Sequence, residues 1–437
     1  MLLPGRIIDD LFPVVHRLGE IMKYLLCLLS LSFLVIGCSQ TTTDMSKNGS
    51  VSVAQPNFDP TEWEHICDVN KDGTVDDMDL ELVRTSLNQK NSQYDVNNDG
   101  IVNVLDIVRV RNSIGWIRPV IQIGSFDQLL GFAALSRDRK SFAWRMAFVD
   151  NVVFSRRIGP PGVRLYGSDF HIQGNGYTID MAEQNFVDGM TISENATNGI
   201  EFFAQNVTME NVKIVGFDGG GSAVKCYIDN RLEMKNVTFE NIGAVVHPFL
   251  APEPIPSAYY TWGGQPVGGR ARISIFIDCT WENCALDNLY THCVYLTGEQ
   301  LYVFASRTIK SGHPMKFLPS GERSNQLVVL INNSFDLLPV PFRTSEMRLP
   351  FLLLPYQPLV AISNEFTWDE STDKWHGSPL WNRAPDRMVD SVLRHNIYRG
   401  LVDRNMTWMV PSDTGKPVSL EIWIKEFEGS SIWNFKD

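Results

Sequence analysis

A short element recurs at an almost constant spacing between residues 211 and 397. Each copy has a polar residue, two further residues and a bulky apolar residue that ends a β-type run. The final apolar residues are 25, 42, 28, 26, 31 and 31 residues apart and are Ile214, Phe239, Trp281, Ile309, Phe335, Phe366 and Ile397. The interval of 42 becomes regular if about 17 residues of the Pro- and Gly-rich stretch 247–270 are an insertion. A period of about 20–30 residues predicts that the chain winds into a solenoid.

The coils of this solenoid are expected to be strands. The runs 232–239, 273–281 and 326–331 alternate and are rich in Val, Ile, Phe and Thr, a pattern typical of β-structure. With an earlier coil at 163–180, they resemble the right-handed parallel β-helix of the pectate-lyase-like superfold. The resemblance implies a mainly β domain over residues 117–400, with caps over 117–160 and 401–437. The competing architecture is a β-sandwich, which does not need a near-constant period.

Four chemically active residues recur one coil apart. His292 and Tyr295 precede His313 and Lys316, respectively, by 21 residues. Because adjacent strands lie about 4.8 Å apart, a coil of that length brings His292 beside His313 and Tyr295 beside Lys316. Residues three apart point to opposite faces of a straight strand, so His292 and Tyr295 need a bend between them to share one face.

His292, Tyr295, His313 and Lys316 are the candidate catalytic residues. Lysis of a uronic-acid polymer needs a cation at the carboxylate, a base for the α-proton and an acid for the leaving oxygen. Lys316 supplies the cation, His292 or His313 supplies the base, and Tyr295 supplies the acid. The HxxY and GHxxK pair is similar to patterns in many bacterial β-helix proteins. The alternative is a polar ladder in which stacked His and Tyr side chains satisfy each other and Lys is solvated.

Other chemistries find less support in the sequence. Hydrolysis needs carboxylates about 5–9 Å apart, and the nearby candidates are Asp278, Glu282 and Asp287. Arg307 and Lys310 add positive charge in the connecting coil. A net charge of −12 argues against nucleic-acid binding. The seven cysteines contain no CxxC pair, which argues against a zinc ribbon or a disulfide framework.

Two twelve-residue loops have the pattern of calcium sites. They begin at Asp68 and Asp95, and each has oxygen-bearing side chains at positions 1, 3, 5, 9 and 12 and Gly at position 6. Calcium takes about six to eight oxygen ligands, and the Gly allows the sharp turn around them. The predicted ligands, with position 7 contributing its carbonyl, are Asp68, Asn70, Asp72, Thr74, Asp76 and Asp79, then Asp95, Asn97, Asp99, Ile101, Asn103 and Asp106. The alternative is a pair of Asx-rich turns without metal.

The tandem loops, with Asp at position 12 and an amphipathic stretch after each, resemble the dockerin module over residues 59–116. This segment has 12 acidic and 5 basic residues. Such an excess of acid is expected at cation sites, whose carboxylates repel one another in the absence of metal. The resemblance implies two calcium ions and a cohesin-like protein partner. Positions 10 and 11 are Asp77-Met78 and Val104-Leu105, not the Ser/Thr pairs frequent in cellulosomal dockerins, so packing onto its own chain is the alternative. Position 8, Val75 and Val102, is expected to pair between the loops.

The N-terminal segment is typical of a targeting signal. Lys23 precedes an apolar run of 13 residues, which is too short for a membrane span and suits a signal peptide. Val35-Ile36-Gly37-Cys38 resembles the bacterial lipobox, which implies lipidation of Cys38 and, because Ser39 is not Asp, an outer-membrane or surface location. The alternative is an ordinary cleaved signal with a chance Cys. Residues 1–37 are thus read as signal, with 1–21 an extension ahead of Met22, and 38–58 as a flexible linker.

These features predict a secreted, lipid-anchored protein with a calcium-binding module and a β-helix. Its predicted activity is the cleavage or modification of polysaccharide, with lysis favoured over hydrolysis. The alternative function is a non-catalytic surface module that binds glycan or protein along the solenoid.

Overall fold

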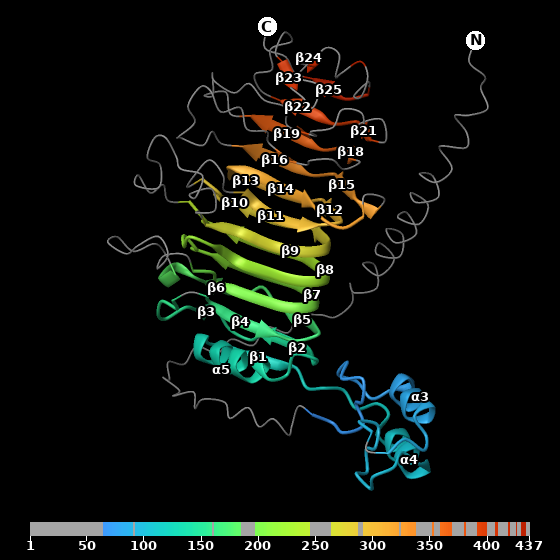
Figure 1. The fold of residues 1–437 in the computed structure, drawn as a ribbon. Helices are drawn as coiled ribbons and strands as arrows, with labels where there is room; N and C mark the ends of the chain where they lie inside the picture. The colour runs from blue at the N-terminus through green and yellow to red at the C-terminus, as the bar shows by residue number, and fades with distance from the viewer. Residues whose placement is uncertain are drawn as a thin grey trace, which may run out of the picture. The chain divides into compact units, whose positions relative to one another are not determined.

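Parallel strands that pair between successive coils dominate the computed structural model (Figure 1). Within the described part of the chain, 23 strands join one sheet, and a separate antiparallel pair is formed by β23 (Thr407–Met409) and β24 (Val418–Ser419). The structure describes residues 64–90, 92–159, 161–184, 197–244, 264–286, 292–322, 325–337, 352–353, 359–368, 380–381, 391–399, 407–409, 418–419, 425 and 430–433. The signal, Cys38, Asp287 and the predicted linker lie outside these residues.

The large sheet consists of three parallel ladders, here called A, B and C. Three long strands bend and contribute to more than one ladder: β7 (Ile200–Val215), β8 (Ser222–Glu240) and β9 (Gln265–Ile277). Ladder A also contains β1 (Ile121–Ile123), β2 (Ala143–Phe148), β5 (Asp169–Gln173), β12 (Gln300–Phe304), β15 (Leu327–Ile331), β18 (Leu359–Ile362) and β21 (Val392–Arg394).

Ladders B and C are built in the same way. Ladder B adds β3 (Val152–Val153), β6 (Thr178–Asp180), β10 (Thr280–Glu282), β13 (Arg307–Ser311), β16 (Ser334–Leu337), β19 (Glu365–Trp368), β22 (Ile397–Arg399) and β25 (Ile432–Trp433). Ladder C adds β4 (Val163–Tyr166), β11 (His292–Gly298), β14 (His313–Pro319), β17 (Leu352–Leu353) and β20 (Leu380–Trp381). Repeated winding into parallel ladders is consistent with a β-helix or solenoid. It does not agree with a β-sandwich, whose sheets are antiparallel.

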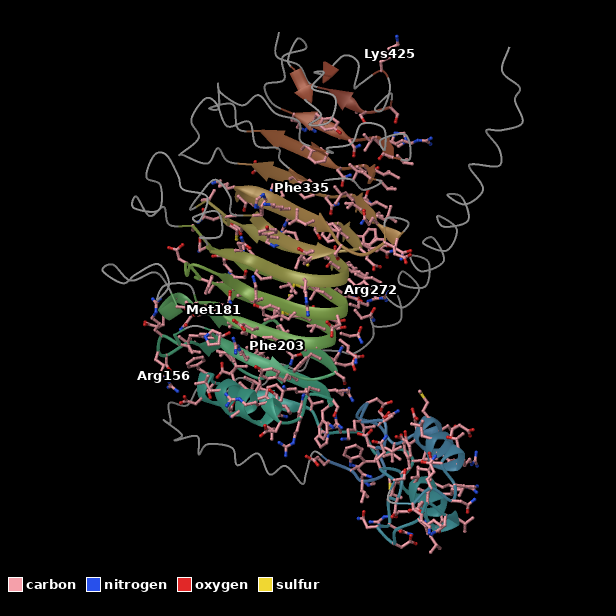
Figure 2. The ribbon with its side chains drawn as sticks, in the orientation of Figure 1. Arg156, Met181, Phe203, Arg272, Phe335 and Lys425 are labelled. Carbon is pink, nitrogen blue, oxygen red and sulfur yellow. The ribbon has the colours of Figure 1, made fainter. Side chains whose placement is uncertain are left out.

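Inward side chains of successive coils stack on one another to form the core. In ladder B, the rings of Phe335 and Phe366 are 5.4 Å apart and those of Phe366 and Tyr398 are 5.1 Å apart between centroids. Phe335 can be followed among the side chains in Figure 2. In ladder A, buried Met209, Met234 and Phe276 hold consecutive register positions. Parallel pairing therefore places like side chains over like, as the constant period predicts.

A left-handed residue marks seven successive turns from ladder A to ladder B, beginning with the turn within β7. Its φ lies between 48° and 56° at Asn211, Asn236, Asp278, Ala305, Asn332, Ser363 and His395. The next residue is buried, and the third residue after the turn faces the core. Asn and Asp tolerate this backbone conformation better than other non-glycine residues, which explains the polar residue that opens the sequence repeat.

Two copies of the repeat lie one residue away from their predicted position. Thr308, not Ile309, continues the inward row from Trp281, and Tyr398, not Ile397, continues it from Phe366. Ile309 and Ile397 are half-buried, whereas Thr308 and Tyr398 are at most 1% exposed. The left-handed turns at Ala305 and His395 set this phase, and neither residue is the Asn, Asp or Ser that marks the other turns.

A buried asparagine ladder follows the last three of these turns. Asn333 Nδ2 donates to Asn364 Oδ1 at 2.9 Å, and Asn364 Nδ2 donates to Asn396 Oδ1 at 3.0 Å. The backbone N–H groups of Asn333 and Asn364 donate to the same two oxygens. Asn364 Nδ2 also donates to the Leu330 carbonyl. The asparagine side chains thus bond to backbone N–H and carbonyl groups of neighbouring coils at the turn.

Helix α5 (Phe126–Arg137) packs against β4 and β1 near the start of the sheet. Ser125 caps its N-terminus by accepting from the Gln128 N–H. Its buried Phe126, Leu129 and Phe132 join the core of the ladders. The helix thus shields the apolar end of the first coil. This agrees with a cap within residues 117–160, although that boundary stays a prediction.

A second, smaller core belongs to the two loops and the helices that follow them. Helices α3 (Asp77–Thr85) and α4 (Val104–Ser113) pack together around buried Cys67, Val69, Val75, Leu80, Val83, Val96, Val102 and Val110. The apolar positions of the predicted amphipathic stretches thus form this core.

Removing the amide of Asn364 tests the asparagine ladder. Asn364→Ala is expected to lower the free energy of unfolding by about 2–4 kcal/mol, because buried partners left unsatisfied cost about 1–3 kcal/mol each. Asn325→Ala is the matched control, since Asn325 is exposed, and a change within about 0.5 kcal/mol is expected. Urea unfolding followed by circular dichroism measures both. Equal effects of the two variants would contradict the role of the ladder.

Candidate functional site

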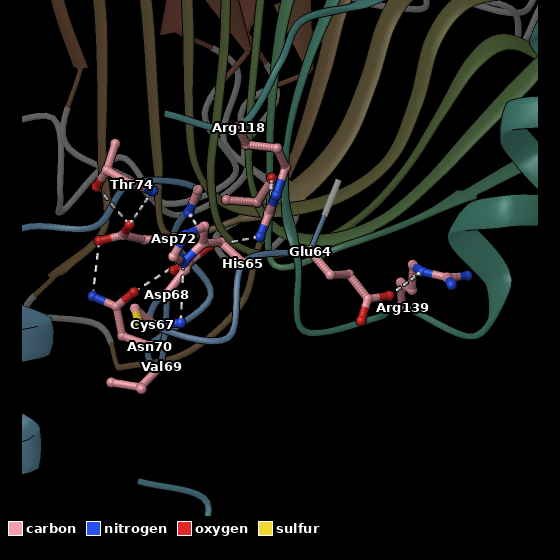
Figure 3. Close-up of polar contacts among 12 residues, drawn as sticks. Glu64, His65, Cys67, Asp68, Val69, Asn70, Asp72, Thr74, Arg118 and Arg139 are labelled. Carbon is pink, nitrogen blue, oxygen red and sulfur yellow. Dashed lines mark hydrogen bonds and ion pairs between the residues drawn. The ribbon is translucent and has the colours of Figure 1, made fainter. Parts of the chain in front are cut away.

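The first metal loop is held by its own side chains, as Figure 3 shows. Asp72 Oδ1 accepts from the N–H and hydroxyl of Thr74, and Asn70 Nδ2 donates to Asp72 Oδ2 at 2.8 Å. Asp68 Oδ2 accepts from the Gly73 N–H at 3.2 Å. These contacts gather positions 1, 3 and 5 on the inner side of the turn. Gly73 has a φ of 94°, a conformation that L side chains rarely adopt.

The second loop repeats most of this arrangement, with Ile101 at position 7 and Asn103 at position 9. Asp95 accepts from the N–H groups of Asp99 and Gly100, and Asn97 Nδ2 donates to Asp99 Oδ2 at 2.9 Å. Asn103 replaces the acid at position 9, and its amide also donates to Asp99. The amides of Asn97 and Asn103 hold the pKa of Asp99 below its usual range.

Positions 9 and 12 of each loop also form a helix cap. Asp76 and Asn103 are the N-caps of α3 and α4, and Asp79 and Asp106 complete the capping boxes. Both Asp79 and Asp106 are fully buried. Their oxygens accept from loop N–H groups, so the acid at position 12 ties the helix start to the loop. One residue thus serves local helix formation and the charge of the site.

The expected pairing of position 8 between the loops is wrong. The Val75 N–H donates to the Trp116 carbonyl, and the Val75 carbonyl accepts from Gly115. Val102 exchanges both bonds with Gln89 and Asn88. Each loop therefore pairs with the segment after a helix, loop one with the end of α4 and loop two with the end of α3. Val75 and Val102 still share one core.

The fit of each loop to a cation depends on the arrangement of its carboxylates. No group of three or more His, Cys, Asp or Glu side chains converges on one point within the described residues. The carboxylates bond instead to their own loop N–H and amide groups. Asp68 Oδ1, however, is buried without a hydrogen-bond partner, which is costly for a carboxylate. An oxygen ligand of this kind fits calcium, with the Asn and backbone oxygens of the pattern completing the set.

Burial raises the pKa of Asp68 to about 6. Arg118 opposes this rise, and the nearby carboxylates of Asp79 and Asp72 add to it. Asp68 is therefore the loop residue whose protonation competes with a cation near neutral pH.

The predicted register of the catalytic candidates is found in ladder C. His292 pairs with His313, and Tyr295 pairs with Lys316, between β11 and β14. The Lys316 Nζ lies 4.6 Å from the centroid of the Tyr295 ring, a cation–π contact. The structure thus brings together the residues that the 21-residue spacing predicts to be neighbours.

The three candidates whose side chains the structure describes differ in exposure. Tyr295 and Lys316 are half-buried, whereas His292 is 6% exposed. The His292 and Tyr295 rings are 6.0 Å apart between centroids. Burial raises the pKa of Tyr295, which keeps its hydroxyl protonated and able to donate. Tyr295 and Lys316 are therefore the accessible pair.

The remaining polar candidates lie on another ladder. Arg307 and Lys310 belong to β13, and Asp278 and Glu282 flank or end β10, all in ladder B. Arg307 Nε donates to Thr280 Oγ1 at 3.2 Å. They are therefore not register neighbours of Tyr295 and Lys316 in ladder C.

Cysteine chemistry is disfavoured by burial. Cys226, Cys279 and Cys284 are fully buried and free, and burial raises the pKa of each to about 12. A thiol of that pKa supplies almost no thiolate nucleophile.

An aromatic row on the outer face of ladder C was not predicted. The rings of Tyr166 and Phe203 are 4.9 Å apart between centroids, and those of Phe203 and Tyr227 are 4.6 Å apart. A cavity of about 490 Å³ at the Tyr166 end is lined by Arg137, Asp138, Lys140, Ser141 and Tyr166. The alternation of buried and half-buried residues along these strands could have predicted that the three rings face outward. Their stacking into one row can be recognised only when the coils are aligned.

A comparison with protein families matches residues 66–115 to the dockerin type I domain. The match spans both loops, and it supports calcium binding by this module and a cohesin-like protein partner. Dockerin modules are often carried by carbohydrate-active enzymes. Searches of curated proteins and of solved structures gave no match.

No helix among the residues the structure describes is long and apolar enough to cross a membrane.

Calcium binding by the first loop is expected to depend on pH. The Asp95→Asn variant disables loop two, so that loop one is the intact calcium site. Its calcium affinity should fall about tenfold between pH 7 and pH 5, because protons displace the cation as the pH falls through the Asp68 pKa of about 6. The matched Asp68→Asn variant disables loop one, so that loop two is the intact site, and a smaller change in its calcium affinity is expected. Isothermal titration calorimetry at both pH values measures this, and equal changes would contradict the assignment.

Proposed function

We propose that the chain is a calcium-dependent docking protein whose β-domain acts on polysaccharide. The dockerin type I match across both loops carries this proposal. Each loop would hold one calcium ion, the first through Asp68, Asn70, Asp72, Thr74, Asp76 and Asp79, and the second through Asp95, Asn97, Asp99, Ile101, Asn103 and Asp106. Bound calcium would neutralise the carboxylates that otherwise repel one another and so stabilise the loops. The ladders are proposed to form a right-handed parallel β-helix of the pectate-lyase-like type.

The docking surface is proposed to be the exposed apolar face of the module. Val104, Leu105 and Val108 on α4 are 64%, 60% and 48% exposed, and Met78 on α3 is 63% exposed. Exposed apolar side chains that cluster on packed helices favour a protein partner. The two helices differ at position 10, where α3 has Asp77 and α4 has Val104, so α4 supplies more of the apolar contact. This face supports a cohesin-like partner.

A charge on α4 tests the docking proposal. Leu105→Asp is expected to weaken calcium-dependent binding to a purified cohesin domain at least about tenfold, because it buries an unpaired charge in an apolar contact. Val153→Asp is the matched control, since Val153 is a 54% exposed apolar residue of β3. Surface plasmon resonance across a panel of cohesin domains, with and without a chelator, measures the effect. Absence of binding to the whole panel would contradict the proposal.

Lysis of a uronic-acid polymer is the activity that the outer face of ladder C supports best. Lys316 would neutralise the substrate carboxylate, and the protonated Tyr295 hydroxyl would donate to the leaving oxygen. One of the histidines, His292 or His313, would take the α-proton. The 6% exposure of His292 makes it the weaker candidate for that step. The protein is proposed to be secreted and held on the cell surface or outer membrane by a lipid on Cys38.

The second candidate function is glycan or protein binding without catalysis. The aromatic row Tyr166, Phe203 and Tyr227 and the adjacent cavity favour it. Aromatic side chains with cationic neighbours are typical of surfaces that bind sugars.

Cleavage of a panel of uronic-acid polymers separates these two functions. Absorbance of the unsaturated product is expected to rise, and Lys316→Ala and Tyr295→Phe are each expected to reduce kcat by about 100-fold or more. Arg307→Ala on ladder B is the control and should retain activity. Full activity in both ladder C variants would show that the catalytic placement is wrong. Binding without cleavage would favour the second function.

A further inference from the structure

One arginine connects the first metal loop to the first coil of the sheet. The side chain of Arg118 is 1% exposed, and its Nη2 donates to Asp68 Oδ2 at 2.8 Å. Nη1 donates to the Ala143 carbonyl at the start of β2. The guanidinium carbon lies 4.6 Å from the Phe142 ring centroid and 5.7 Å from that of Trp144. Figure 3 shows Arg118 reaching toward Asp68. A buried cation is thus bonded to both parts at once.

Backbone hydrogen bonds reinforce the same connection. The Arg118 N–H donates to the Gly73 carbonyl at 2.7 Å, and the Ala143 N–H donates to the Lys71 carbonyl at 3.1 Å. Lys71 and Gly73 are positions 4 and 6 of the first loop. The turn that would surround a cation therefore also bonds to the segment just before β1 and to the start of β2.

The two oxygens of Asp68 have different surroundings. Oδ2 accepts from Arg118 and from the Gly73 N–H. Oδ1 is buried and has no hydrogen-bond partner. A carboxylate oriented on one oxygen by a buried donor leaves the other available to a metal, which is how outer residues position metal ligands.

The second loop has no matching arrangement. Its first position, Asp95, accepts from the backbone N–H groups of Asp99 and Gly100 within the same loop. The predicted side-chain ligands of loop one include four carboxylates and those of loop two include three. The charge of Arg118 brings the net charge of the first set to that of the second, so it offsets the extra acid without making the site unattractive to a divalent cation.

We propose that Arg118 is a positioning residue for the first calcium loop, and that this loop is the joint between the calcium module and the first coil. Cation binding at Asp68 Oδ1 and order in β2 are then thermodynamically linked, and each stabilises the other. Loop two stabilises the module alone. This inference rests on the calcium binding proposed above, and it deepens that proposal by giving the two loops different roles.

Hydrogen exchange on the full chain tests this link. Calcium at about ten times its Kd should slow exchange of the amides in residues 143–148 about tenfold in the wild type and in Asp95→Asn. The same addition should leave these amides unchanged in Asp68→Asn. The Ala143 amide is the direct reporter, because it bonds to the loop.

Calorimetry on an arginine variant tests the positioning role. Arg118→Gln is expected to weaken the loop-one site about 10- to 100-fold while the loop-two site keeps its affinity. Arg111→Gln, an exposed α4 arginine, is the matched control and should bind as the wild type. If Arg118→Gln does not fold, Arg118→Lys keeps the charge but loses the forked contact, and the same selective weakening is expected.

The outcomes separate this inference from the proposed function. Two bound calcium ions with no change in β2 exchange, or equal β2 protection in Asp68→Asn and Asp95→Asn, would overturn the joint alone. No calcium binding to the wild type would overturn the calcium proposal and the joint together.

Discussion

The parallel pairing between successive coils is the constraint on which the rest of the large sheet depends. Each coil contacts chiefly its two neighbours. Its turn must therefore direct the equivalent residues of the following strand toward the core, as the turn of the preceding coil does. The left-handed residue at seven successive turns and the buried residue after it meet this requirement. Where the buried residue is Asn, as at Asn333, Asn364 and Asn396, the side chains also satisfy the backbone groups that the bend leaves free. The aromatic and aliphatic rows of the core follow from this register.

The calcium module faces a different problem, because its apolar core is small and several of its loop carboxylates are buried. Asp79 and Asp106 have no exposed surface, and Asp68 is 5% exposed. Hydrogen bonds from loop N–H groups and the capping of α3 and α4 offset part of the cost of burying these charges. A divalent cation would supply further compensation, and metal binding would then be coupled to the folding of the module. Arg118 adds a fixed cation at the one loop that contacts the sheet.

Chemistry on the β-domain depends on which side chains of ladder C reach solvent. A parallel register makes Tyr295 and Lys316 neighbours, and the cation–π contact holds them together. The strand alternation that exposes Tyr295 directs His292 inward. Of the described side chains among the candidates, the Tyr295 hydroxyl and the Lys316 ammonium are therefore more accessible than the His292 ring.

Local sequence was sufficient to predict the features that depend on spacing. The 21-residue interval predicted the His292–His313 and Tyr295–Lys316 pairs, and the Asp and Gly positions predicted two loops within the residues matched as a dockerin type I domain. These features depend on neighbours in the chain or on a constant period. The inward residue was displaced at Ile309 and Ile397 because the turns at Ala305 and His395 lack the Asn, Asp or Ser that marks the other turns.

The tertiary structure alone decided the contacts that no period encodes. The Asp68–Arg118 pair joins residues 50 positions apart, and Val75 pairs beyond α4 rather than with Val102. The aromatic row Tyr166, Phe203 and Tyr227 appears only when unequal coils are aligned. Sequence by itself determined that the chain winds in β-coils and carries two Asp- and Gly-patterned loops, because local alternation and residue spacing are sufficient for both. Packing decided which of those residues are buried, exposed or joined, because that depends on distant segments meeting in space.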